Sequence, residues 1–320
     1  MTSPSPFHFG EQALQSHAGL RERLEAVGRV AIRDHMPDQH RELFGRLPTL
    51  LVAAQDDDGQ PWATMLHGPA GFVRSPDART LRIAGRLVED DPVTQWLVKD
   101  ARVGLLGLEP HTRRRNRANG RVRSAIADVV EVAVRQSFGN CPKYIHAREP
   151  EIVLRPPPPP VRQLGPALND AALDLLRRAD TLFIASASDA RAASGDDGGR
   201  PQGVDVSHRG GRPGFLRIDV DARPRAAVRL TMPDYTGNFF FNTLGNLLAW
   251  PKAGLLVPDY TDGSLLHLAA DASIDFDLEA LNGFPGALRL LRLDVRTAWW
   301  REGALPLRWS TPVAPPQFAF

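Results

Sequence analysis

Side chains that could bind an anion are concentrated between Gly203 and Asn246. A histidine and an arginine supply donors there, and adjacent glycines let a ligand approach the backbone. A helix predicted to begin near Asn242 would aim unpaired N–H groups and its positive dipole end at the same place. The pattern predicts a phosphate site, and the alternative is a polar hairpin with an ordinary helix cap. The candidate binding residues are Ser207, His208, Arg209, Gly211, Asn238, Asn242 and Thr243.

A second candidate stretch, QSFGNCPKYI, covers residues 136–145. Asn140, Lys143 and Tyr144 follow the end of a predicted strand, and a lysine beside a tyrosine suits a planar anionic ligand. The alternative is a proline turn with a buried cysteine. Cys141 has no evident catalytic partner, and a lone cysteine is usually a small hydrophobic residue. No catalytic residue is therefore assigned.

The anion site needs strands to hold it. We expect strands over 204–208, 214–220 and 227–232, a turn over 233–238, and then the helix. Earlier in the chain, helical spacing of apolar residues predicts a helix over 11–33 and another over 91–99. Short strands are expected over 49–54, 62–66, 71–73, 80–84, 103–108 and 127–134. Many short strands at close spacing indicate a sandwich or barrel, so the fold class is mainly β with a few helices.

The composition of the chain indicates the kind of compartment to expect. The 320 residues carry a net charge of +2 and one cysteine, which excludes an intrachain disulfide and favours a reducing compartment. No apolar run reaches the roughly 18–20 residues of a membrane span, and no secretory signal is visible. We expect a cytoplasmic protein without a membrane partner. The scattered histidines lack zinc-ligand spacing, so no metal site is expected.

Four short patterns recur in the same order in the two halves of the chain. TLLVAA at 49–54 is echoed by TLFIAS at 181–186, and GPAGFVR at 68–74 by GRPGFLR at 211–217. The remaining echoes are GQP with GRP and VGLL with AGLL. Such repetition predicts two similar β domains packed as a pseudo-dimer. We expect a helical segment over 1–46, a first barrel over 47–155, a proline-rich linker over 156–166 and a second barrel over 167–320.

The motifs QSFGNCPKYI, DVSHRGGRPGF and PDYTGNFFFNTLGN, in this order, resemble the pyridoxamine 5′-phosphate oxidase-related, FMN-binding split-barrel family, in particular its tandem two-barrel branch. The resemblance implies two split barrels with FMN at their interface. It implies that the second barrel holds the phosphate and that Asn140, Lys143 and Tyr144 close over the ring system. Where the oxidases proper have Ser-Arg-Lys at the start of the phosphate-binding helix, this chain has Phe241-Asn242-Thr243. That departure argues against oxidation of pyridoxamine phosphate.

The reciprocal site, with the roles of the two barrels exchanged, looks degraded. Glu89, Asp90 and Asp91 stand at the matching place in the first barrel, where carboxylates would repel a phosphate. We therefore expect one FMN per chain.

An arginine-rich run, HTRRRNRANGRVR, covers residues 111–123. It could bind nucleic acid, but it has no aromatic residue to stack on bases. The favoured interpretation is a solvated hairpin, or arginines that pair with carboxylates across the interface between the barrels. No nucleic-acid partner is expected.

Two function classes remain open from the sequence. One is a flavin-dependent oxidoreductase acting on a small-molecule substrate, with an electron-transfer reductase as a partner to be tested. The other is a flavin-binding module without turnover. Homodimerisation, the substrate and the electron acceptor are left open, because split barrels support several chemistries.

Overall fold

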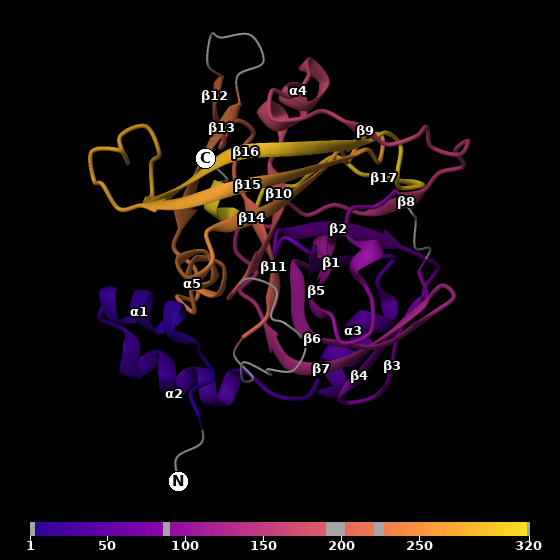
Figure 1. Cartoon of the computed structure of the whole chain (residues 1–320), viewed down its shortest axis with the longest axis horizontal. Helices are drawn as coiled ribbons and strands as arrows, with labels where there is room; N and C mark the ends of the chain where they lie inside the picture. The colour runs from indigo at the N-terminus through magenta and orange to yellow at the C-terminus, as the bar shows by residue number, and fades with distance from the viewer. Residues whose placement is uncertain (1–3, 86–89, 190–201, 221–226, 319–320) are drawn as a thin grey trace.

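The computed structural model describes residues 4–85, 90–189, 202–220 and 227–318 (Figure 1). The chain begins with three helices, α1 (Phe9–His17), α2 (Arg21–Ala31) and α3 (Asp38–Arg46). The single helix expected over 11–33 is wrong. Gly19 adopts a left-handed φ of 68° and separates α1 from α2, because this conformation is readily adopted only by glycine. The helices α1 and α2 lie together beside the two sheets (Figure 1).

Seven strands from the first half form one antiparallel sheet in the order β2-β1-β5-β6-β7-β4-β3. The 3₁₀ turns η1 (Thr94–Trp96) and η2 (Pro110–Thr112) precede β5 and β6. The helix expected over 91–99 is therefore wrong, and only η1 forms there. The strands are β1 (Thr49–Gln55), β2 (Pro61–His67), β3 (Val73–Asp77), β4 (Thr80–Ile83), β5 (Arg102–Glu109), β6 (Arg114–Ile126) and β7 (Val129–Gly139).

The second half forms another antiparallel sheet, in the order β11-β10-β14-β15-β16-β13-β12. Helix α4 (Asp170–Arg178) precedes β10, and α5 (Asn242–Ala249) lies between β13 and β14. The expected start of α5 at Asn242 is confirmed. The strands are β10 (Thr181–Ala187), β11 (Val204–Gly210), β12 (Arg217–Val220), β13 (Val228–Tyr235), β14 (Lys252–Pro258), β15 (Leu265–Asp275) and β16 (Ala287–Arg301).

The turn expected over 233–238 begins later than predicted. Pro233 and Asp234 continue strand β13 and pair with β16, with a register shift between Asp234 and Tyr235. The shift re-aims the chain at the point where it leaves the sheet towards α5, because an irregularity of this kind bends a strand.

The two sheets have the same strand order, and one pair of neighbouring strands has the same register in both. Ala53 of β1 pairs with Gly104 of β5, and Ala185 of β10 pairs with Gly254 of β14 at the corresponding position. Both glycines touch the opposite sheet. A Cβ at Gly104 would lie 2.8 Å from the Cα of Asp205, and one at Gly254 would lie 2.2 Å from the carbonyl oxygen of Pro61. A glycine at each position therefore lets the sheets approach at backbone contact.

The core between the sheets is apolar and draws on both halves. Leu51, Met65 and Leu106 from the first sheet share one buried cluster with Phe183 and Leu256 from the second. Burial of this kind is the main stabilising contribution to packing between sheets. The mainly β architecture with two large antiparallel sheets agrees with the fold class expected from the sequence.

The proline run at 156–160 lies outside regular structure, but its neighbours do not. Strand β9 (Arg162–Gln163) pairs with β16, and β8 (Pro150–Ile152) pairs with β17 (Leu307–Trp309) near the end of the chain. The last regular element is the 3₁₀ turn η3 (Pro316–Phe318). Among the described residues, no helix is both long and apolar enough to cross a membrane.

Candidate functional site

A cavity lies where elements from both halves meet. About 120 Å³ of its interior is accessible to the centre of a water-sized sphere. The first half contributes β6 and the segment after β7, and the second half contributes β11, β13, the start of α5 and β16. Its lining includes Arg115, Arg117, Asn140, Cys141, Lys143, Tyr144, Ser207, His208, Arg209, Gly210, Asp234, Tyr235, Asn238, Phe239, Phe241, Asn242, Thr243 and Arg289.

The structure brings together all but one of the residues singled out from the sequence. Asn140, Lys143 and Tyr144 lie on one side, and the other members are Ser207, His208, Arg209, Asn238, Asn242 and Thr243. Gly211 is the exception. Its N–H donates to the carbonyl of Asp180, its carbonyl accepts from His146 Nε2, and it is absent from the lining.

Gly210 takes the place expected for Gly211. A Cβ at this position would lie 2.0 Å from the carbonyl oxygen of Tyr144, closer than any side chain can be accommodated. Tyr144 itself has a left-handed φ of 66°, which is rare for a bulky residue. A glycine at position 210 is thus what allows the segment after β7 to reach β11 and close the cavity.

The cavity is rich in positive charge. Arg115, Arg117, Lys143, Arg209 and Arg289 line it, with Asp234 as the one carboxylate among the lining residues. Asp234 is already shared, since Arg209 Nη1 lies 3.1 Å from its Oδ1 and Arg289 Nε lies 3.3 Å from its Oδ2. Burial and the neighbouring guanidinium of Arg117 lower the pKa of Arg115 to about 9, so Arg115 is still a cation at neutral pH. The surplus of cations favours an anionic ligand.

Five side-chain nitrogen atoms at this cavity have no hydrogen-bond partner among the described residues. They are Asn140 Nδ2, His208 Nε2 and the Nε atoms of Arg117, Arg209 and Arg289, and each is buried. Buried polar atoms are nearly always paired, and each unpaired one costs free energy. Burial lowers the pKa of His208 well below its usual value, with Arg115 contributing, so its ring is neutral at physiological pH. The unpaired atoms thus favour a ligand that accepts hydrogen bonds.

The start of α5 contributes hydroxyl and amide groups. Thr243 Oγ1 donates to Ser207 Oγ at 3.0 Å, which ties the first turn of the helix to β11. Phe241, the residue before the helix, has a φ of 63° and caps no N–H with its side chain. The N–H groups of the first turn of a helix have no intrahelical partners. This end of α5 therefore faces the cavity with donors but without a cation of its own.

Arg117 joins the two sheets through a buried carboxylate. Its Nη1 donates to Asp205 Oδ1 at 3.0 Å, and its Nη2 donates to the hydroxyl of Ser207. Asp205 also accepts from Asn119 and from Asn246 Nδ2. Among the arginines of the run at 111–123, Arg117 confirms the expectation of pairing across the interface.

Sequence reasoning missed the part that Arg115 and Arg117 have in the lining. Both lie on β6, and residues two apart in a strand face the same side. The alternation of Arg115 and Arg117 was the signal that could have identified them. Arg289 of β16 stands in the mainly apolar run LRLLRLDV, which also contains Arg292, so the sequence offered only a weak signal for it.

The reciprocal position, which corresponds to this cavity when the two sheets are exchanged, is filled by side chains. Arg301 Nη1 lies 2.5 Å from Asp91 Oδ2, both groups are buried, and Thr64 also donates to Asp91. The rings of Trp62 and Trp299 pack with centroids 5.6 Å apart beside them. Of the three carboxylates noted in the sequence, Asp91 is paired with Arg301, Asp90 is exposed, and Glu89 lies outside the described residues.

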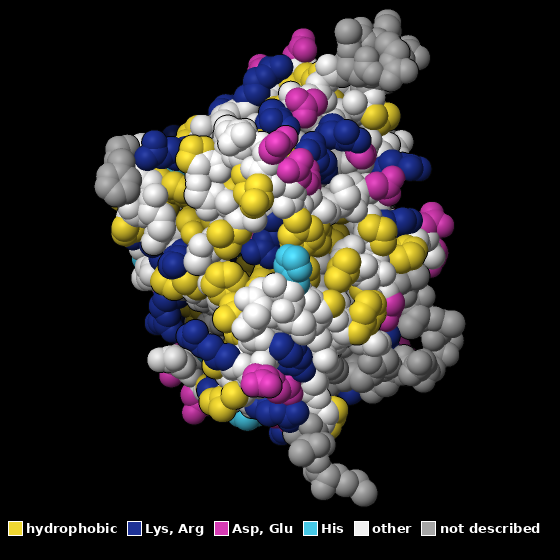
Figure 2. Space-filling model, turned by 90° about the vertical axis from the view of Figure 1, so that its left-hand side faces the viewer, with side chains coloured by type: hydrophobic (Ala, Val, Ile, Leu, Met, Phe, Trp, Pro, Cys, Tyr) yellow, Lys and Arg dark blue, Asp and Glu magenta, His cyan; other side chains and the backbone are white. Residues whose placement is uncertain are grey.

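A second cavity adjoins the first and shares Tyr144, Phe215 and Tyr235 with it. The rings of Tyr144 and Tyr235 stack with centroids 5.4 Å apart, and Phe318 of η3 packs against both. The face shown in Figure 2 carries hydrophobic and basic side chains across its middle, with acidic side chains towards its upper part, its lower part and its right-hand edge. Among the described residues no cluster suitable for a metal ion is found.

Residues 36–156 match the family model described as pyridoxamine 5′-phosphate oxidase. The family resemblance expected from the sequence is thereby confirmed for this part of the chain. No curated protein sequence matches the chain.

Several solved structures are similar to part of the chain. A putative pyridoxamine 5′-phosphate oxidase from Lactobacillus delbrueckii is 15% identical, over 41% of this chain and 93% of its own, with a TM-score of 0.28. An FAD-binding protein from Mesorhizobium loti is 15% identical, over 44% and 97%, with a TM-score of 0.26. A pyridoxamine 5′-phosphate oxidase-related, FMN-binding protein from Nostoc punctiforme is 12% identical, over 47% and 100%, with a TM-score of 0.25.

Proposed function

We propose that the cavity binds FMN, one molecule per chain, and that the protein is a flavin-dependent oxidoreductase acting on a small molecule. The observation that carries this proposal is the set of unpaired donors at Asn140, His208 and Arg209 within a cation-rich cavity. A phosphorylated ligand with a polar ring edge supplies both the negative charge and the acceptors that these groups lack. The match of residues 36–156 to the oxidase family supports a flavin in particular.

The residues present fit the two ends of such a ligand. Thr243 and Asn242, with Arg115 and Arg117 nearby in the lining, would hold the phosphate. The cations come from β6 rather than from the first turn of α5, which offsets the missing Arg-Lys pair noted in the sequence. Asn140, Lys143, Tyr144 and Arg209 would hold the ring system, as the resemblance implies.

Bound FMN supplies two-electron transfer, and the chain supplies placement and electrostatics. Lys143 and Arg209 would favour the reduced, anionic form of the ring, because a fixed cation stabilises charge that develops beside it. Asp234 is held by two arginines, so it is a poor general base. His208 is neutral and its Nε2 is unpaired, which makes it the candidate for holding or moving a proton.

One site per chain follows from the filled reciprocal position. The buried Arg301–Asp91 pair and the adjacent Trp62 and Trp299 rings occupy the related place. Opening that place to a second flavin would leave a buried charge unpaired, which is strongly unfavourable. The two-barrel division at residues 47–155 and 167–320 remains part of this proposal.

The proposal is tested by titrating purified protein, stripped of any flavin, with FMN and following flavin fluorescence and absorption. We expect saturation at one FMN per chain, and two per chain or no binding would overturn the proposal. Anaerobic mixing of the loaded protein with NADH, NADPH and candidate substrates then tests turnover. Reduction by one of them supports an oxidoreductase, whereas failure with every donor favours a flavin-binding module without turnover.

A further inference from the structure

Helix α1 packs against α5 at backbone contact, although the two are far apart in the sequence. A Cβ at Gly10 would lie 2.2 Å from the carbonyl oxygen of Gly245, and a Cβ at Gly245 would lie 2.6 Å from the backbone N of Glu11. A larger residue at either position would force the helices apart. The N-terminal segment is therefore built closely onto the helix whose first turn lines the cavity (Figure 1).

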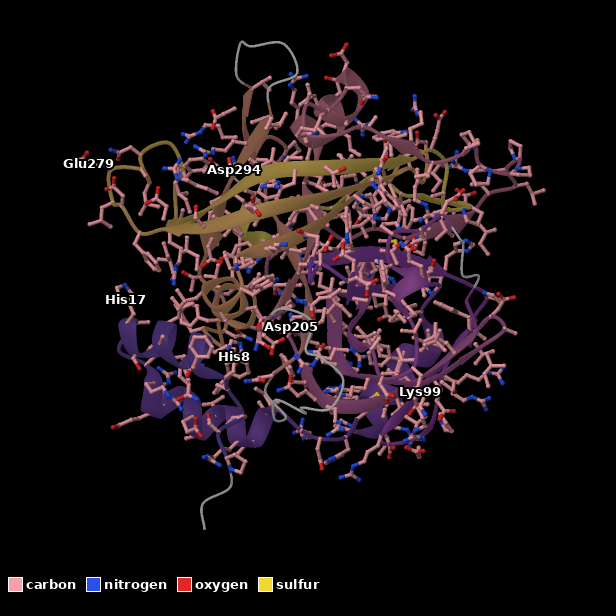
Figure 3. The ribbon with its side chains drawn as sticks, viewed as in Figure 1. His8, His17, Lys99, Asp205, Glu279 and Asp294 are labelled. Carbon is pink, nitrogen blue, oxygen red and sulfur yellow. The ribbon has the colours of Figure 1, made fainter. Side chains whose placement is uncertain are left out.

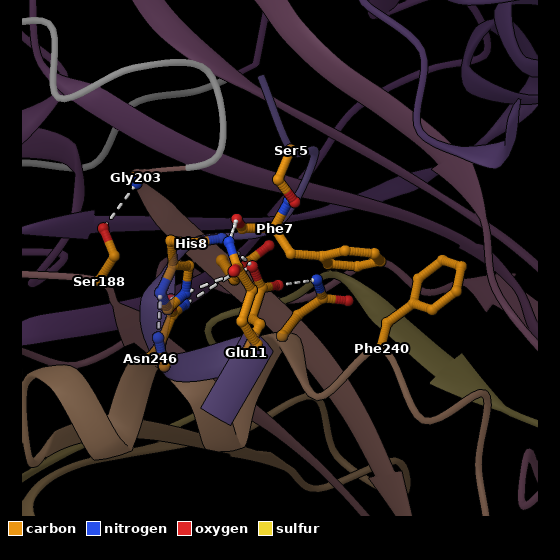
Figure 4. A network of polar contacts seen from close by, with 12 residues as sticks. Ser5, Phe7, His8, Glu11, Ser188, Gly203, Phe240 and Asn246 are labelled. Carbon is orange, nitrogen blue, oxygen red and sulfur yellow. Dashed lines mark hydrogen bonds and ion pairs between the residues drawn. The ribbon is translucent and has the colours of Figure 1, made fainter. Parts of the chain in front are cut away.

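Glu11 of α1 reaches this first turn. Its Oε1 accepts a hydrogen bond from Asn242 Nδ2 at 2.5 Å, and its Oε2 accepts from the N–H of His8 at 2.9 Å. The residue is 3% exposed. Figure 4 shows Glu11 between His8 and the start of α5. Because Asn242 lines the cavity, the carboxyl group of Glu11 is one residue removed from the cavity.

A hydrogen-bond chain continues from His8 into the interface between the sheets. His8 Nδ1 accepts from the N–H of Gly10, so its Nε2 carries the proton and donates to Asn246 Oδ1 at 2.9 Å. Asn246 in turn donates to Asp205. His8 and Asp205 lie close together beside the N-terminal helices in Figure 3. The N-terminal segment is thus connected to both the helix start and the Arg117–Asp205 pair.

Glu11 has little to neutralise it. Among the described residues the basic group nearest its carboxyl is His8, at 3.6 Å, and burial lowers the pKa of His8. Asp205 on β11 faces Glu11 with a like charge, and Arg117 on β6 offsets it only in part. Burial, with Asp205 adding to it, raises the pKa of Glu11 to about 8. The carboxyl is therefore uncharged at pH 7 and becomes an anion in mildly alkaline solution.

We propose that Glu11 is a positioning residue of the phosphate site, which holds Asn242 in place while neutral and weakens the binding of phosphate-bearing ligands when it ionises. The inference rests on the proposed function. The unpaired Nε2 of the buried His208 in the same cavity is the independent sign that a ligand belongs there. An anionic Glu11 would repel the phosphate across Asn242 and leave a buried charge without a cation.

The experiment compares FMN with riboflavin, which has the same ring system and no phosphate. Dissociation constants are measured by flavin fluorescence at pH 7 and pH 9.5 for the wild type, Glu11→Gln and Glu22→Gln. Glutamine keeps an acceptor for Asn242 and is common at this position of a helix cap. Glu22 is the matched control, because it is also in the first turn of a helix but is exposed.

For the wild type we expect FMN to bind about tenfold more weakly at pH 9.5 than at pH 7, the change that one ionisation can produce. A phosphate monoester has its second pKa near 6, so its own charge stays constant in this range. Riboflavin should show no such change. Arg115, whose pKa is about 9, also loses charge in this range, so Glu11→Gln should make the change in FMN binding smaller without abolishing it, and Glu22→Gln should retain it in full.

Two results would overturn the inference while leaving the proposed function intact. One is FMN binding that does not change with pH in the wild type, which requires no variant to fold. The other is an equal pH dependence in Glu11→Gln. Failure of every form to bind FMN at either pH would instead contradict the proposed function.

Discussion

Arg117 and Asp205 form a buried ion pair that joins the two sheets, with Nη1 and Oδ1 3.0 Å apart. Arg117 comes from β6 and Asp205 from β11, and both are buried. The pair lies at the wall of the cavity, since Arg117 and Ser207, which it also contacts, line it. The packing of the halves and the shape of the site are therefore coupled through one carboxylate.

We expect Arg117→Ala to destabilise the protein by about 3 kcal/mol or more, because it leaves Asp205 buried without its cation. The measurement is the free energy of unfolding in urea. Arg229→Ala is the control, since Arg229 pairs with Asp294 on the surface at 2.6 Å and exposed pairs contribute about 0–1 kcal/mol. Equal effects of the two substitutions would contradict the importance given to the buried pair.

Gly210→Ala should disrupt the cavity. The new Cβ would meet the carbonyl oxygen of Tyr144 at 2.0 Å, so the segment after β7 must move away from β11. We expect FMN affinity to fall at least about tenfold, which corresponds to about 1.4 kcal/mol. Gly45→Ala in α3 is the control, because no atom lies within 4 Å of its added Cβ, and alanine in a helix is favoured by about 0.5–1 kcal/mol.

The sequence predicted several of the strands, the start of α5 and nine of the residues that line the cavity, because these depend on local patterns. Ser207 and His208 stand on one predicted strand, Arg209 directly follows it, and Asn242 and Thr243 stand at one predicted helix start. Glu11 could not be found in this way. Its contact with Asn242 depends on how α1 packs on α5, and no local pattern encodes the Gly10–Gly245 approach.

Arg115 and Gly211 also depend on the folded structure. Arg115 lines the cavity although it was not predicted to, and Gly211 was predicted to line it but does not. Arg115 was grouped with a basic run. Its spacing from Arg117 places both residues on one side of a strand, and the folded structure shows that this side faces the cavity. Gly211 was chosen for backbone freedom next to a ligand, but its tight contact is with the ring of Phe215. A glycine in a sequence does not show which neighbour, if any, approaches it closely.

Buried His267 predicts a loss of stability in acid. Burial lowers its pKa in the folded protein to about 4, whereas the unfolded value is about 6.5. Between these values the unfolded chain binds a proton that the native state does not, so stability falls as the pH falls from about 6.5 towards about 4. The ring donates its Nδ1 proton to the carbonyl of Ala63 at 2.9 Å, which holds it in place.

The wild type and His267→Gln should therefore differ in how steeply the free energy of unfolding changes with pH. We expect the wild type to lose about 1 kcal/mol more per pH unit than the variant within this interval. The variant's lower stability at neutral pH does not affect this comparison, because the slope is what is measured. His111→Gln, at an exposed position of η2, should leave the wild-type slope unchanged. Parallel curves for all three proteins would show that His267 is not the responsible group.

Arg115 provides a test of where the phosphate lies. Its side chain lines the cavity, and its Nε donates to the carbonyl of Cys141 at 2.9 Å, which fixes the guanidinium. Arg114, the preceding residue, is exposed, because neighbouring residues of a strand face opposite sides. The two arginines thus form a matched pair of charges, one at the site and one away from it.

We expect Arg115→Ala to weaken FMN binding about tenfold to a hundredfold, since a hydrogen bond to a charged group contributes about 1.5–3 kcal/mol. Riboflavin binding should change much less if Arg115 contacts the phosphate, and as much as FMN binding if it contacts the ring. Arg114→Ala should leave both affinities within about twofold, because its charge is screened by solvent. Equal losses of FMN affinity in Arg114→Ala and Arg115→Ala would mean that net charge, rather than the geometry of the cavity, attracts the ligand.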